Sequence, residues 1–148
     1  MKYLSSEELM RDNHKIIAEN THLPLVAWIP DWKIARIKDT NEPEIDLETG
    51  RYKLTFIEEI YQINNRLFGD SGIRLILLTP YDKVQDWVDK IDGIMIPGGR
   101  DIDPEFYGEE NTASKFEKLD AKIRYESILN WFNEGDLKMP IFLICFGF

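Results

Sequence analysis

The chain has 148 residues, which is enough for one domain with a hydrophobic core. Its net charge of −9 and pI of about 4.7 disfavour nucleic acid and anionic membrane surfaces as partners. The charged N-terminus lacks the apolar segment of a signal peptide, no apolar run approaches the roughly 20 residues of a membrane helix, and one cysteine makes no internal disulfide. We therefore expect a cytoplasmic protein.

The N-terminal part of the chain predicts a helix, a strand and a long loop. Ser5 and Glu8 have the spacing of a capping box, which predicts a helix over residues 5–20. The run "LPLVAWIP" at residues 23–30 is typical of a buried strand bounded by prolines. The polar, turn-rich stretch that follows predicts a loop over residues 31–53.

The rest of the chain alternates helical patterns with apolar runs. In order, the patterns predict a helix over 52–72, a strand over 73–80, a short helix over 81–91, a strand over 92–99, a helix over 114–135 and a strand over 139–146. The strands are continuous apolar runs, as expected for strands that are buried on both faces. This order predicts a flavodoxin-like, three-layer α/β/α fold with a mostly parallel sheet.

Ligand sites in such sheets form at the carboxyl ends of the strands, where two features stand. The third predicted strand runs into the pair Gly98 and Gly99, and Cys145 lies at the end of the fourth. Each has a simpler interpretation, because a glycine pair often only ends a strand and a lone buried cysteine is often a core residue. Asp101 and Asp103 are similarly ambiguous between metal binding and the capping of a turn.

Residues 97–108, "PGGRDIDPEFYG", and residues 144–147, "ICFG", resemble the class I glutamine amidotransferase-like hydrolases. The resemblance is to the gamma-glutamyl hydrolase and gamma-glutamyl-GABA hydrolase branch. It covers roughly residues 23–148, which we expect to be the N-terminal part of such a domain, and it leaves residues 1–22 as an N-terminal helical extension.

The resemblance implies hydrolysis of gamma-glutamyl amide bonds in a small substrate, through a cysteine thioester and without a metal or other cofactor. The residues it implicates are Cys145 as nucleophile, Gly98, Gly99 and Phe146 at the oxyanion hole, and Asp101, Asp103 and Tyr107 in substrate binding.

The family's catalytic His and Glu lie beyond the nucleophile. We therefore expect the fold to be truncated after the nucleophile strand and the 148 residues alone to be inactive, with a missing C-terminal half or a second chain covering that strand. His14 and His22 precede the first strand and are expected at the surface or in a loop, whereas the four tryptophans are expected to pack in or around the core. The alternative function is a non-catalytic domain of the same fold that acts in assembly or ligand binding.

Overall fold

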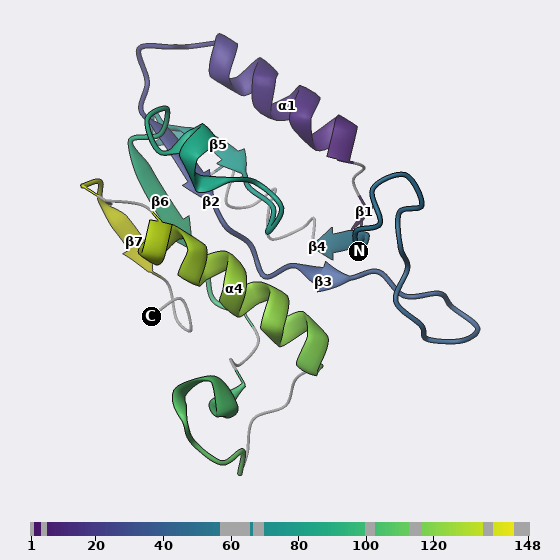
Figure 1. The fold of residues 1–148 in the computed structure, drawn as a ribbon. Helices are drawn as coiled ribbons and strands as arrows, with labels where there is room; N and C mark the ends of the chain where they lie inside the picture. Colours follow the sequence, from purple (N-terminus) through teal and green to yellow (C-terminus); the bar gives the residue numbers. More distant parts are fainter. Residues whose placement is uncertain are drawn as a thin grey trace.

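The central feature of the computed structural model is a four-stranded parallel sheet in the order β5-β2-β6-β7 (Figure 1). The described residues are 2–3, 6–56, 66, 70–99, 103–112, 117–134 and 138–143. The strands of this sheet are β2 (Leu25–Trp28), β5 (Arg74–Leu77), β6 (Gly93–Ile96) and β7 (Ile141–Leu143). Each lies inside a predicted apolar run, and all neighbours pair in parallel. The predicted α/β, flavodoxin-like fold is confirmed.

Both faces of the parallel sheet are covered. The helical elements are α1 (Ser6–Ala18), α3 (Val84–Trp87), the 3-10 helix η1 (Pro104–Tyr107) and α4 (Lys118–Glu134). Leu75 of β5 packs in one buried cluster with Leu9 of α1, whereas Ile76 packs in a second cluster with Trp131 of α4. Because neighbouring strand residues point to opposite faces, α1 and the C-terminal half of α4 lie on opposite sides of the sheet (Figure 1). Fully burying each such side chain contributes about 1.5–3 kcal/mol.

A second, antiparallel sheet corrects the prediction of a loop over residues 31–53. Its order is β1-β4-β3, and its strands are β1 (Lys2–Tyr3), β3 (Lys33–Ile34) and β4 (Leu54–Phe56). Between β3 and β4 the chain folds back on itself through isolated bridges, Arg36 with Pro43 and Ile45 with Tyr52. This segment projects away from the parallel sheet (Figure 1). The strands were missed because two- or three-residue strands carry no periodic pattern of their own.

The predicted helices agree with the structure to different extents. The first and last are confirmed as α1 and α4. The predicted helix over 52–72 is wrong at its start, where β4 pairs with β1 and β3, and most of its remainder lies outside the described residues. The short helix predicted over 81–91 is reduced to the single turn of α3. No helix within the described part of the chain is long and apolar enough to cross a membrane.

Candidate active site

Two long-range hydrogen bonds hold the segment after β2, residues 29–34, at the carboxyl ends of the strands. The indole Nε1 of Trp32 donates to the carbonyl oxygen of Leu78, just past β5, at 2.9 Å. The backbone N–H of Ile34 donates to the buried Asp120 carboxylate on α4 at 2.8 Å. These contacts fix the position of Asp31, which directly precedes Trp32, beside the N-terminal half of α4.

The predicted glycine turn follows β6 at the same end of the sheet. β6 and Pro97 are buried, Gly98 is half-buried and Gly99 is exposed. Ile96, the last residue of β6, pairs in register with Leu143, the last residue of β7. The turn therefore begins where β6 and β7 end side by side.

Gly99 is required to be small because other groups approach it closely. A Cβ atom added at this position would lie 2.7 Å from Cγ of Asp31 and would overlap the Arg124 guanidinium. The φ angle of Gly99 lies outside the left-handed region. Close approach of side chains, and not a positive φ, is therefore the reason for glycine at position 99.

The group that approaches Gly99 is a buried arginine. Arg124, on the second turn of α4, is 4% exposed. Its Nη1 lies 3.8 Å from Oδ1 of Asp31, whose side chain is 16% exposed, and its Nη2 donates to the carbonyl oxygen of Pro97 at 3.3 Å. One guanidinium thus joins the segment after β2, the turn after β6 and helix α4.

Loss of either member of the Arg124–Asp31 ion pair should lower the free energy of unfolding substantially. Removing two charges from water costs several kcal/mol per ion, and their attraction offsets this only when geometry and further hydrogen bonds are good. Truncating one partner leaves the other as an uncompensated charge in a largely dry site, at a cost of about 3–5 kcal/mol. The pair therefore holds the carboxyl ends of β2 and β6 in one arrangement.

The short helix η1 places the remaining predicted residues. Asp103 is buried, and its Oδ1 accepts a hydrogen bond from the N–H of Glu105 at 3.1 Å, which caps η1. The ring of Phe106 stacks on Tyr125 of α4 with centroids 4.5 Å apart. Tyr107 is left 62% exposed at the end of η1. The Asp103 side chain thus has the capping role that the sequence also allowed, and a substrate contact from Asp103 or Tyr107 stays a prediction.

The other predicted site residues, Asp101, Cys145 and Phe146, lie outside the described residues. Both histidines are exposed, as expected. His14 lies on α1, which packs against β5 at the opposite edge of the sheet from β7, and His22 precedes the amino end of β2. Neither histidine is therefore at the carboxyl end of β6 or β7.

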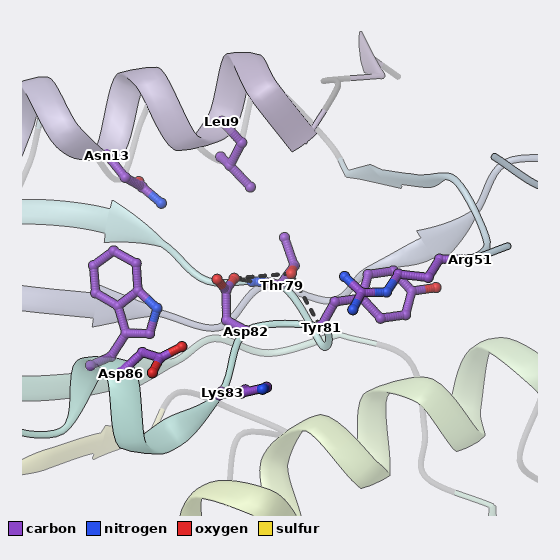
Figure 2. A pocket seen from close by; sticks show the side chains of 9 residues that line it. Leu9, Asn13, Arg51, Thr79, Tyr81, Asp82, Lys83 and Asp86 are labelled. Carbon is purple, nitrogen blue, oxygen red and sulfur yellow. Dashed lines mark hydrogen bonds between the residues drawn. The ribbon is translucent and has the colours of Figure 1, made fainter. Parts of the chain in front are cut away.

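A separate cavity of about 220 Å³ lies beside the carboxyl end of β5 (Figure 2). The Asp82 carboxylate on its wall accepts hydrogen bonds from the N–H and Oγ1 of Thr79, at 2.7 and 2.9 Å. Burial raises the pKa of Tyr81, whose hydroxyl donates to the carbonyl oxygen of Tyr52. The lining residues are Leu9, Asn13, Arg51, Thr79, Tyr81, Asp82, Lys83, Asp86 and Trp87. None of them is a predicted site residue, and within the described residues no three His, Cys, Asp or Glu side chains form a metal site.

Sequence reasoning missed Arg124 and Asp31, although a signal for the first was present. Asp120, Arg124 and Ser127 are buried on α4 together with Trp131, at spacings of four, three and four residues. That spacing describes one face of a helix, so polar residues within it indicate a buried polar stripe. Asp31 carries no comparable signal, because it follows a strand and resembles any polar loop residue.

Comparison with known proteins identifies one family. The model of the family Peptidase C26 matches residues 42–148, which includes the glycine turn, η1, α4 and β7. A search of curated proteins found no match to this chain. The matched region excludes β2, although β2 is a central strand of the same sheet. With most of its length matched, the chain belongs to the Peptidase C26 family, a family of hydrolases of the glutamine amidotransferase-like type.

Proposed function

We propose that the complete protein hydrolyses gamma-glutamyl amide bonds, with Cys145 as the nucleophile. The observation that carries the proposal is the register of β6 and β7. Gly98 and Cys145 each stand two residues beyond the paired strand ends, Ile96 and Leu143. Neighbouring strands are about 4.8 Å apart, a spacing that suits a nucleophile and an oxyanion donor acting on one carbonyl group. Family membership supports hydrolysis as the type of reaction.

The reaction follows from thiolate chemistry. The sulfur of Cys145 attacks the side-chain carbonyl carbon of a gamma-glutamyl group, and the carbonyl oxygen becomes an oxyanion. The C–N bond then breaks, the amine or ammonia leaves with a proton, and a thioester remains. Water attacks the thioester, releases glutamate and returns the sulfur as thiolate.

The oxyanion needs fixed N–H donors where its charge develops. In this proposal the glycine turn at Gly98 and Gly99 supplies one donor and the N–H of Phe146 supplies the other. Loss of one such donor typically costs on the order of 100–1,000-fold in kcat. Asp101, Asp103 and Tyr107 are the proposed substrate contacts, because they follow the turn closely in sequence.

The positions of the two histidines indicate whether either one can act as the general base for Cys145. His14 is on the helix beside β5, and His22 is before β2, so both are remote from the carboxyl ends of β6 and β7. The base that activates Cys145 is accordingly another group. The same observation favours the alternative function, a non-catalytic domain of this fold that binds a ligand or a partner.

The presence of a single cysteine makes a direct test possible, because every thiol reaction of the chain reports Cys145. The protein is incubated with a diazoketone analogue of glutamine and, separately, with the analogue of asparagine, which is one methylene shorter. Adducts are measured by intact-protein mass spectrometry, with Cys145→Ala as the blank. We expect the glutamine analogue to label Cys145 faster than the asparagine analogue, and free glutamine or a gamma-glutamyl amide to protect it.

Equal slow labelling by both analogues, without protection, would contradict a gamma-glutamyl site and favour the non-catalytic alternative. Glutamate release from gamma-glutamyl amides that persists in Cys145→Ala would refute the assignment of the nucleophile.

A further inference from the structure

We infer that Arg124, held by Asp31, is a positioning residue that makes the N–H of Gly98 the oxyanion donor of the glycine turn. The inference rests on the proposed function and goes beyond it, because it selects one of the two glycines and names the side chain that orients it. It starts from the contact of Arg124 Nη2 with the carbonyl oxygen of Pro97 at 3.3 Å.

The direction of the Gly98 N–H follows from peptide geometry. The carbonyl of Pro97 and the N–H of Gly98 belong to one peptide unit, which is planar and, like all described peptide bonds, trans. In a trans peptide these two groups point in opposite directions. Because the oxygen is turned toward the guanidinium on α4, the N–H of Gly98 points away from α4. A carbonyl group on that side of the turn would meet this donor.

The arginine also makes the donor stronger. A hydrogen bond from a charged group to a carbonyl is roughly twice as strong as a neutral one, and it polarises the whole peptide unit. The N–H at the other end of that unit carries more positive charge as a result. A planar guanidinium serves two acceptors in fixed directions, here Asp31 and Pro97, which the single point charge of a lysine does less well.

Packing prevents the turn from rotating out of this orientation. Gly99 lies against both Asp31 and Arg124, at distances that leave no room even for a methyl group. Arg124 is 4% exposed and therefore cannot swing into water. The peptide that bears the donor is thus held by the hydrogen bond at Pro97 and is followed by the closely packed Gly99.

The test compares two reactions of the same thiol. Attack on the ketone of the glutamine diazoketone passes through an oxyanion, whereas alkylation by iodoacetamide does not. In Arg124→Met we expect the diazoketone rate to fall on the order of 100-fold while the iodoacetamide rate is unchanged. Arg124→Lys should restore part of the diazoketone rate. Arg74→Met is the matched control, because Arg74 donates to the carbonyl of Ile17 on the far edge of the sheet.

Nuclear magnetic resonance gives a second readout that needs no turnover. Selective labelling with ¹⁵N-glycine gives signals from nine glycines. We expect the Gly98 amide signal to move downfield when the wild-type protein forms its adduct, and to move much less in Arg124→Lys. A shift of Gly99 in place of Gly98 would overturn the selection of the donor.

Each outcome has a distinct meaning. If wild-type Cys145 shows no preference for the glutamine analogue, the proposed function fails. If it shows that preference and the Arg124 variants keep it, the positioning role is overturned. If both thiol reactions fall together, Arg124 has only a structural role, and the inference is again overturned. The double variant Asp31→Asn with Arg124→Met removes both charges and keeps the comparison in a folded protein where Arg124→Met alone unfolds.

Discussion

Both polar ends of the Asn13 side chain contact the backbone of one residue, Leu77. Nδ2 of Asn13 donates to the carbonyl oxygen of Leu77 at 2.7 Å, and the N–H of Leu77 donates to Oδ1 of Asn13 at 3.2 Å. Leu77 ends β5, which is an edge strand of the parallel sheet among the described strands. A side chain from α1 therefore occupies the hydrogen-bonding positions that a further strand would take.

Asn13→Ala should lower the free energy of unfolding by about 1–3 kcal/mol, because it leaves a buried N–H and carbonyl of β5 without these partners. Asn130→Ala on α4 is the matched control, since Asn130 is exposed and both changes raise helix propensity equally. Urea denaturation measures both. Equal stabilities for the two variants would show that the contact contributes nothing.

Gly99→Ala should destabilise the protein by about 1–3 kcal/mol, because the added methyl group overlaps the groups around Gly99. Gly108→Asn is the comparison. Gly108 has a φ of 81° and no atom within 4 Å of an added Cβ, and asparagine tolerates that backbone conformation. In thermal unfolding, Gly99→Ala should have a clearly lower melting temperature than Gly108→Asn. The reverse order would contradict the close approach of Asp31 and Arg124 to Gly99.

Tyr81→Phe should reduce the loss of stability at alkaline pH. Burial raises the pKa of Tyr81 above 10.0 in the folded protein, so the folded state holds this proton more tightly than the unfolded state. The contribution to stability is fully present below pH 10.0 and is lost as the pH rises through the folded pKa. Urea denaturation of the wild type and Tyr81→Phe at a series of pH values around and above 10.0 measures the difference in the free energy of unfolding. The exposed Tyr107 supplies the control, and an equal change in Tyr107→Phe would rule out burial as the cause.

Phe142→Lys should weaken self-association. Phe142 is 57% exposed on β7, which among the described strands pairs only with β6. An apolar edge strand is a template for pairing with another strand, and an added lysine opposes such pairing. Phe132→Lys on α4 is the control, since Phe132 is 46% exposed but not on a strand. Sedimentation velocity should show smaller species for Phe142→Lys only. Identical profiles for both variants would argue against pairing through β7.

The strands of the parallel sheet could be predicted because their composition is decisive. Runs such as residues 75–78 and 94–96 are short and apolar throughout, which is typical of strands covered on both faces. β4 was missed for the opposite reason. Phe56 continues a helical spacing in the sequence, yet residues 54–56 pair with β1 and β3, and tertiary pairing prevailed over the local pattern.

The glycine turn was predictable as a turn at the end of a strand, but the side chains that pack against it were not. Gly98 and Gly99 stand out in the sequence because they follow a strand directly. Arg124 and Asp31 meet only because α4 crosses the carboxyl end of β2, and this contact depends on the assembled layers. The sequence pattern predicts helix α4, whereas the packing of the layers determines which residues its polar face contacts.

The sheet order also sets a delay during synthesis. β2 lies between β5 and β6, so the segment at residues 25–28 finds no partner until residues 74–77 have been made. At typical translation rates that interval is about 2–10 s. β2 and β5 pair in parallel and so form no hairpin, and such non-local pairing is slower than the roughly 1–10 μs that a hairpin takes. Synthesis therefore sets the earliest time at which this sheet can start to assemble, and until then the apolar strand β2 has two unpaired edges in every nascent chain.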